Sequence, residues 1–290
     1  MLWIIPAFAS AIGVALQSVY IKKNTFHFNE LIVTWSVLAF SSILYLPLLF
    51  ISNKPDLSIT FWIAVIARLF IDSIGFTFYI KGLKEAPISL AMPMVSIVPI
   101  LLIIVSFIVN HLFPTPLGIL GIIITVFGIY YLNFDHDTKN IFSPFIALKN
   151  NRGVQFVLIF AVSQAFVTSL AKLGIDKSNL LFYTSFYQLF WAVCFLPVAY
   201  FANPKEFRSI FNVRDLKRLF PVGGLDALQV FAQNIAFVLT LPVYVQSVQN
   251  TSILFASFFG WYFFKEKLEK HVIPTILIAI GIILLTLAQK

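Results

Sequence analysis

Apolar stretches of about 20 residues recur along the whole chain, and short polar segments rich in charge, Pro or Asn separate them. A stretch of this length crosses the hydrocarbon core of a bilayer as one α-helix. The predicted spans are 2–21, 31–51, 59–80, 86–109, 117–132, 153–172, 180–201, 219–240, 241–264 and 272–288. We therefore expect an all-α integral membrane protein with ten transmembrane helices.

The composition excludes a water-soluble globular protein. Of the 290 residues, 60% are hydrophobic and 11% are charged, and the mean hydropathy is +0.93. A soluble domain carries about 25% charged residues. Most of the surface must therefore contact the lipid bilayer.

The two halves of the chain resemble each other. Residues 11–53 align with residues 161–203 without gaps at an offset of 150. The identical pairs include Ala11/Ala161, Ala15/Ala165, Lys22/Lys172, Asn29/Asn179, Thr34/Thr184, Phe40/Phe190 and Pro47/Pro197. We predict a first repeat at 1–134, a polar linker at 135–152 and a second repeat at 153–290. Because each repeat has five spans, the second must enter the membrane inverted, giving the two inverted five-helix repeats typical of secondary transporters.

The distribution of positive charge indicates which loops lie on the cytoplasmic side of the membrane. The net charge is +8, and most of the 20 Lys and Arg residues lie in the loops that follow the first, third, fifth, seventh and ninth spans. The positive-inside rule places these loops in the cytoplasm and both termini outside. Because the cations lie in short loops and form no separate basic domain, we expect no nucleic-acid partner.

The third predicted span contains two charged residues near its middle. Arg68 and Asp72 lie four residues apart, and Tyr79 continues the same helical face. Charged side chains inside a membrane are costly and mark a substrate or ion pathway. The alternative is an ion pair that only joins this helix to its neighbours. Asp72, and Asp226 in the eighth span, are also candidates for carrying a coupling proton.

Polar side chains follow helical spacing in four other spans. They favour the walls of a substrate cavity, although interhelical hydrogen bonding is an alternative. These residues are Gln17, Gln164, Thr168, Lys172, Gln229, Gln233, Gln246 and Asn250. Lys172 is near a helix end, so its ammonium group can also extend to the membrane surface.

Aromatic residues repeat every four positions in the seventh span, at Tyr183, Tyr187 and Trp191. Such a stripe can form a wall for a cation or a flat ligand, or it can pack between helices. The spans 117–132 and 272–288 carry almost no polar groups. We expect them to face lipid or a second copy of the chain, as in a homodimer.

The residues of an enzyme are missing from the sequence. The four His residues lie in or near predicted loops without metal-ligand spacing, and Cys194 is the one cysteine. No nucleophile elbow or phosphate-binding loop occurs. We expect no enzymatic activity, no cofactor and no metal.

Short motifs in both halves resemble a known family. They are FYIKGLKEAPISLA at 78–91 with SIVP at 96–99, FGWYFFKEKL at 259–268 with Gly281, and Lys22 and Lys172 closing the first helix of each repeat. Together they resemble the drug/metabolite transporter superfamily, in its ten-helix EamA-like branch. The first repeat differs, with His111 where the second has Glu266. The resemblance implies export or exchange of amino acids, nucleotide sugars, phosphorylated sugars or drugs, and both termini in the cytoplasm.

These observations predict a secondary active transporter, an exporter or exchanger, that moves a small polar metabolite such as an amino acid by alternating access. Arg68 would grip a substrate carboxylate or phosphate, and Asp72 would orient Arg68. A cationic multidrug exporter that uses Asp72, Asp226 and the aromatic wall is one alternative, and a lipid-headgroup flippase is another. With no organelle-targeting segment, we expect a multi-pass protein of the bacterial inner (plasma) membrane.

Overall fold

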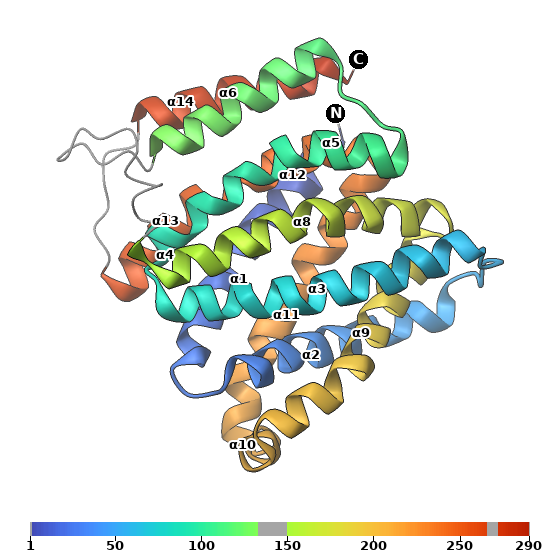
Figure 1. The fold of residues 1–290 in the computed structure, drawn as a ribbon, viewed down its shortest axis with the longest axis vertical. Coiled ribbons are helices and arrows are strands. Elements are labelled where there is room, and N and C mark those ends of the chain that lie inside the picture. The colour runs from blue at the N-terminus through green and yellow to red at the C-terminus, as the bar shows by residue number, and fades with distance from the viewer. Residues whose placement is uncertain (1, 133–149, 266–271, 290) are drawn as a thin grey trace.

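The computed structural model describes residues 2–132, 150–265 and 272–289, and every regular element in these ranges is helical (Figure 1). The helices of the first half are α1 (Ile4–Thr25), α2 (Glu30–Ile51), α3 (Ile59–Glu85), α4 (Ile88–Ala91), η1 (Met92–Ile97), α5 (Val98–Asn110) and α6 (Pro116–Leu132). Those of the second half are α8 (Arg152–Asp176), α9 (Leu180–Ala202), α10 (Pro204–Ser209), α11 (Val213–Leu239), α12 (Pro242–Gln249), α13 (Ser252–Phe264) and α14 (Val272–Ala288). Most of the predicted linker, and Glu266 of the family motif, lie outside the described residues.

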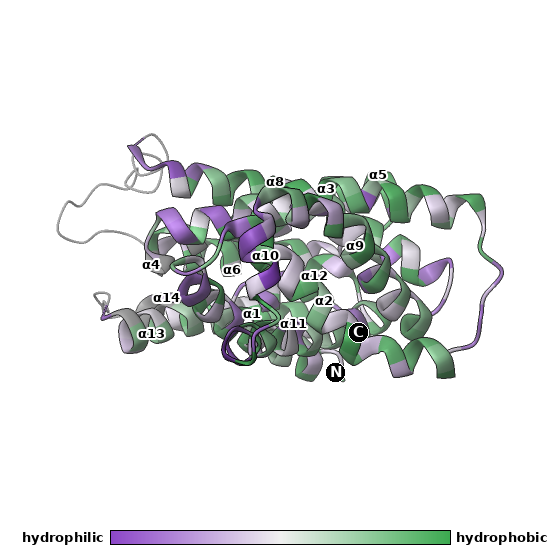
Figure 2. Cartoon of the chain, turned by 90° about the horizontal axis from the view of Figure 1, so that it is seen from below, coloured by the Kyte–Doolittle hydropathy of each residue, from purple (hydrophilic) through white to green (hydrophobic). Residues whose placement is uncertain are grey.

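The helices are those of a multi-pass membrane protein. Six of them, α1, α2, α3, α8, α9 and α11, are long and apolar enough to cross a bilayer, and α5, α6 and α14 are shorter apolar helices. Hydrophobic residues predominate along these helices, while hydrophilic residues gather at helix ends and in α10 (Figure 2). The apolar pattern therefore predicted the long helices correctly.

Two of the ten predicted spans are not continuous helices. The span 86–109 is divided into α4, η1 and α5, and the span 241–264 is divided into α12 and α13. Pro99 lies at the start of α5 and cannot donate a backbone hydrogen bond there. Between α12 and α13, the amide of Thr251 bonds the carbonyl of Val248, three residues back, in place of the α-helical pattern. The second break lies at the polar segment 249–252 and the first lies in mostly apolar sequence, and hydropathy averaged over each whole span predicted single helices.

Two pairs of identical residues have the same local role in both repeats. The side chain of Asn29 caps α2 by accepting a hydrogen bond from the amide of Leu31, and Asn179 caps α9 through the amide of Phe182. Pro47 and Pro197 lie inside these same two helices. The repeated positions thus define where the second helix of each half begins and bends.

Counterpart helices of the two halves make matching contacts. The counterparts are α1 and α8, α2 and α9, α3 and α11, and α5 and α13. α3 packs along α8 as α11 packs along α1, and α5 packs on α8 as α13 packs on α1. α2 pairs with α9, and α6 pairs with α14 at one edge of the molecule (Figure 1). α3 and α11 begin and end 154 residues apart, so Asp72 in α3 corresponds to Asp226 in α11.

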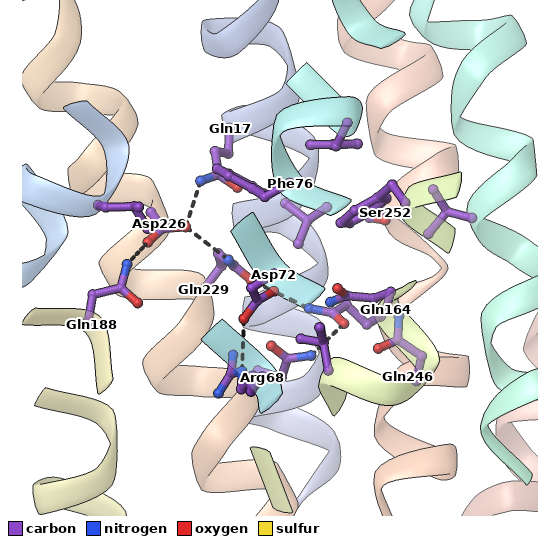
Figure 3. Close-up of a pocket in the computed structure, with 18 of the residues that line it drawn as sticks. Gln17, Arg68, Asp72, Phe76, Gln164, Gln188, Asp226, Gln229, Gln246 and Ser252 are labelled. Carbon is purple, nitrogen blue, oxygen red and sulfur yellow. Dashed lines mark hydrogen bonds and ion pairs between the residues drawn. The ribbon is translucent and has the colours of Figure 1, made fainter. Parts of the chain in front are cut away.

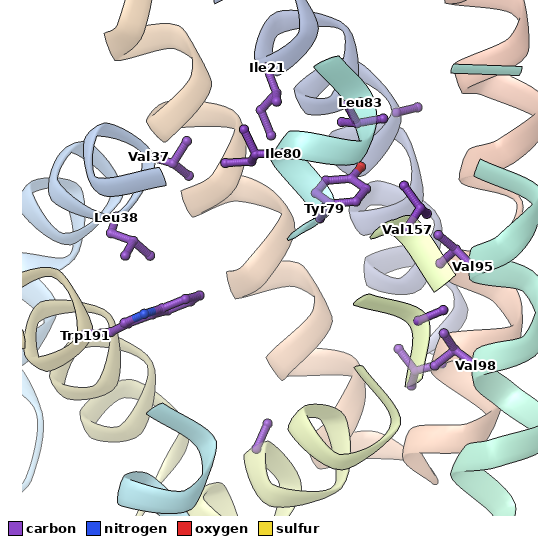
Figure 4. Packing of buried hydrophobic residues seen from close by; sticks show 14 of the residues in the cluster. Ile21, Val37, Leu38, Tyr79, Ile80, Leu83, Val95, Val98, Val157 and Trp191 are labelled. Carbon is purple, nitrogen blue, oxygen red and sulfur yellow. The ribbon is translucent and has the colours of Figure 1, made fainter. Parts of the chain in front are cut away.

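Buried aliphatic side chains fill the bundle between α1, α3 and α8. Ile21, Ile80, Leu83 and Val157 are fully buried and lie near Tyr79 (Figure 4). Because lipid is as apolar as these side chains, close packing is what holds the helices together here.

The contact between α2 and α11 has no equally close counterpart in the other half. α2 packs along much of α11, whereas their counterparts α9 and α3 touch at few positions. A Cβ atom on Gly223 would meet the Cβ of Phe40 and the backbone of Ser41, so only glycine permits this approach of α11 to α2. At the equivalent position, 154 residues earlier, α3 has Leu69. The bulkier side chain keeps α3 and α9 apart.

We expect Gly223→Ala to lower the free energy of unfolding by about 1–3 kcal/mol, because the added methyl group overpacks the contact with α2. Gly224 is the matched control, since a Cβ there would meet nothing within 4 Å. Gly224→Ala should leave stability unchanged or raise it by up to about 1 kcal/mol through helix propensity. Thermal unfolding in detergent micelles measures both, and equal effects would contradict the close contact between α2 and α11.

Candidate functional site

Polar side chains from both halves surround a cavity midway along the long helices (Figure 3). The cavity has a volume of about 90 Å³, which is smaller than the roughly 300–1,000 Å³ typical of sites for drug-sized ligands. Eight of its lining residues are amides: Gln17, Gln164, Gln188, Gln229, Gln233, Gln246, Gln249 and Asn250. Arg68, Asp72 and Asp226 are its charged residues, and Phe76, Tyr79 and Trp191 are among its aromatic ones.

Arg68 and Asp72 form a buried ion pair within α3. Arg68 Nε lies 2.9 Å from Asp72 Oδ2, as their four-residue spacing predicted. Arg68 Nη1 also donates to Tyr183 Oη at 2.7 Å, and the guanidinium lies 4.0 Å from the centre of the Tyr187 ring. The hydroxyl of Tyr187 donates to Asp72 Oδ2 at 2.7 Å. Two tyrosines of α9 therefore hold the pair in place, with two of the five guanidinium N–H groups engaged.

Asp226 has a different environment. Its side chain is 4% exposed, and three amides donate to it: Gln17 Nε2 at 2.8 Å, Gln188 Nε2 at 2.8 Å and Gln229 Nε2 at 3.3 Å (Figure 3). Among the described residues no Lys, Arg or His forms an ion pair with it. The carboxylate is thus hydrogen-bonded by neutral groups, without a protein counter-ion.

A chain of amides connects α11 to the break between α12 and α13. Gln233 Nε2 donates to Gln249 Oε1 at 3.0 Å, and Gln249 Nε2 donates to Ser10 of α1 at 2.7 Å. Asn250 Nδ2 donates to the carbonyl of Ser96 in η1 at 3.4 Å. The two discontinuous helices therefore meet at the cavity through a side-chain bond.

The structure brings most of the predicted site residues together. Gln17, Arg68, Asp72, Tyr79, Gln164, Trp191, Asp226, Gln229, Gln233, Gln246 and Asn250 line the cavity. Tyr183 and Tyr187 do not line it, and instead support Arg68 and Asp72 from behind. Thr168 is buried away from the cavity, and its hydroxyl has no hydrogen-bond partner in the described residues. Lys172 pairs with Asp176 at 2.8 Å and borders a separate hollow near Tyr244.

Sequence reasoning missed Gln188, which bonds both Asp226 and the hydroxyl of Ser41. Its signal was a single amide in the middle of an otherwise apolar and aromatic span. The apolar part of the lining, such as Val14, Leu38 and Phe160, was also missed. Apolar residues that line a cavity have no pattern that separates them from those that pack the core.

The site holds no arrangement for metal binding. Within residues 2–132, 150–265 and 272–289, no three His, Cys, Asp or Glu side chains come together as ligands. The polar groups that line the cavity are amides, one ion pair and one carboxylate with no ion-pair partner among the described residues.

Comparison with known proteins gives three findings. A family model described as the EamA-like transporter family matches residues 1–134 and again residues 151–287. No curated protein matches the chain. A solved structure described as "Crystal structure of protein" is similar at a TM-score of 0.69 and 13% identity, covering 99% of this chain and 96% of that one. That likeness concerns the fold alone.

We expect Gln188→Leu to lower the free energy of unfolding by about 1–3 kcal/mol, because Asp226 Oδ2 loses its amide donor. In an Asp226→Asn background the loss should be smaller, giving a coupling energy above about 0.5 kcal/mol in a double-mutant cycle. Gln233→Leu is the control, since Gln233 bonds Gln249 instead of Asp226. Unfolding in detergent measures all variants, and additive effects of Gln188→Leu and Asp226→Asn would show that their hydrogen bond contributes nothing.

Proposed function

Because the chain belongs to the EamA-like transporter family, we propose that it is a secondary active transporter of a small polar metabolite with an ammonium group, such as an amino acid. The family consists of transporters and not of enzymes, and the sequence-based resemblance to it is confirmed. The choice of substrate is our proposal and is argued from the cavity.

The observation that carries the proposal is the carboxylate of Asp226. A buried ionised group costs several kcal/mol unless it is paired. The three amides offset part of this cost, each hydrogen bond to a charged group contributing about 1.5–3 kcal/mol, but they supply no positive charge. A cation from solution completes the site. We propose that a substrate ammonium group and a coupling proton compete for Asp226.

The counterpart carboxylate, Asp72, already has its cation. It is paired with Arg68, so it is the weaker candidate for proton coupling. Arg68 lines the cavity and keeps N–H groups beyond those that bond Asp72 and Tyr183. We propose that these groups bind a substrate carboxylate, while Asp226 binds the ammonium group of the same zwitterion. The neighbouring amides then select the substrate by hydrogen bonding.

We further propose transport by alternating access between two inverted five-helix repeats, 1–134 and 153–290, joined by 135–152. The matching contacts made by counterpart helices in the two halves support this mechanism. The side-chain bond between the two discontinuous helices at the cavity supports it as well. Export or exchange across the inner membrane of a bacterial cell is the direction and location that we propose. Ile123 of α6 and Ile283 of α14 are exposed and offer an apolar face for a homodimer.

A cationic multidrug exporter is the second candidate. It is favoured by the pairing of Arg68, whose positive charge is already neutralised by Asp72 and whose guanidinium is covered by the Tyr187 ring. The charge left over in the cavity is then that of Asp226. This candidate predicts that substrates need a cation and no carboxylate.

Counterflow uptake in proteoliposomes tests the proposal. We expect uptake of a labelled amino acid that Asp226→Asn reduces by at least about tenfold, the effect of losing about 1.4 kcal/mol of substrate binding. Arg68→Gln combined with Asp72→Asn keeps the pair neutral, and should lose amino acids while retaining an organic amine without a carboxylate. Asp176→Asn, which removes a partly exposed carboxylate at a helix end, is the matched control.

Two results would decide against amino-acid transport. Uptake restricted to organic cations, unchanged by the Arg68→Gln and Asp72→Asn pair, would establish the drug exporter. Wild-type rates in Asp226→Asn would show that the buried carboxylate takes no part in substrate binding.

A further inference from the structure

The widely spaced seam between α3 and α9 contains an apolar groove on the membrane-facing surface. Its rim is open to lipid, since Phe70 is 65% exposed and Ile74 is 58% exposed. Ser73 and Thr77 are the hydroxyl residues among its lining. The groove is lined by Leu31, Leu69, Phe70, Ser73, Ile74, Thr77, Phe78, Cys194, Phe195 and Val198.

The groove exists because of a difference between the two repeats. In the counterpart seam, Gly223 lets α11 lie directly against Phe40 and Ser41 of α2. In the α3–α9 seam, Leu69 and Phe70 replace Gly223 and Gly224, and both of these bulky side chains line the groove. Long side chains span the remaining gap, as Tyr183 reaches Arg68 and Tyr187 reaches Asp72.

One layer of side chains separates the groove from the polar cavity. Trp191 lines the cavity, and its Nε1 donates to the hydroxyl of Ser73 at 2.9 Å. Ser73 lines the groove on the other side. Phe76, which also lines the cavity, packs edge-on against Trp191 at a ring separation of 5.8 Å. The indole of Trp191 therefore lies between the cavity and the groove, and one hydrogen bond joins it to Ser73 in the groove lining.

We propose that the α3–α9 seam is a lateral portal for an amphipathic ammonium compound, whose charged head lies in the cavity at Asp226 and whose apolar chain lies in the groove. Trp191 is the gate, and Ser73 holds it closed. The occupant follows from the adjacency of the two spaces, since Trp191 separates a cavity with a carboxylate that has no ion-pair partner among the described residues from an apolar, lipid-facing groove. The inference rests on the proposed function and narrows its substrate class to molecules with one apolar chain.

The chain provides its own reporter for this test. Cys194 is the one cysteine in the sequence, it is exposed, and it lines the groove. Alkylammonium methanethiosulfonates carry an ammonium head at one end and a thiol-reactive group at the other. The Cys194 thiolate attacks the sulfenyl sulfur, a mixed disulfide forms and methanesulfinate leaves, so no other oxidant or reductant is needed.

The experiment measures the rate of Cys194 modification in nanodiscs with ethyl, hexyl and decyl ammonium reagents. We expect the rate to peak at the chain length that spans from Asp226 to Cys194, and to fall on the order of tenfold in Asp226→Asn, because binding of the head raises the local concentration of the reactive end. Ser73→Ala should speed the reaction of the longer ammonium reagents by releasing Trp191. The uncharged decyl methanethiosulfonate is the matched control and should react equally with all variants.

The outcomes separate this inference from the proposed function when counterflow is measured on the same samples. One outcome would overturn the portal: modification rates that depend only on reagent hydrophobicity and are unchanged in Asp226→Asn, while counterflow is still reduced in that variant. The groove would then hold bilayer lipid only. Insensitivity of both measurements would overturn both proposals. A rate optimum that depends on Asp226 supports the portal, whichever amino acids are taken up.

Discussion

The carboxylate of Asp226 is the constraint around which the centre of this molecule is arranged. It lies in α11, midway through a bundle that faces hydrocarbon, where no bulk solvent can stabilise a charge. Gln17 comes to it from α1, Gln188 from α9 and Gln229 from its own helix. These bonds link α1, α9 and α11 at one point and leave the carboxylate without an ion-pair partner among the described residues.

The duplication of the chain makes the asymmetry of this centre visible. Asp72 and Asp226 occupy equivalent positions in α3 and α11, yet one is paired with an arginine on its own helix and the other is surrounded by amides. Where Arg68 stands in α3, α11 has Val222. Equivalent positions thus form an ion pair in the first half and an amide-bonded carboxylate in the second.

The sequence could predict the long helices and the charged groups because both have a local signature. An apolar run long enough to cross a bilayer favours a helix, and Arg68 and Asp72 inside such a run must be paired or functional. The breaks in the spans 86–109 and 241–264 were not predicted from hydropathy, because an average over a whole span hides a short polar segment such as 249–252. The aromatic spacing placed Tyr183 and Tyr187 on one helical face, but it did not show that they bond Arg68 and Asp72 of α3 instead of lining the cavity. Gln188 escaped notice because a single amide has no periodicity.

The amide lining affects which residues of the cavity can distinguish a positive from a negative ligand. A glutamine side chain offers a donor at one atom and an acceptor at the other, and rotation of its terminal bond exchanges them. Each of the eight amides around the cavity can therefore present either its N–H groups or its oxygen to a bound group. The lining can in this way hydrogen-bond a group of either charge without a change in the net charge of the protein. Discrimination by charge then rests on very few positions. Replacement of a single acidic or basic residue in the lining, such as Asp226, would therefore change the sign of charge that the cavity favours.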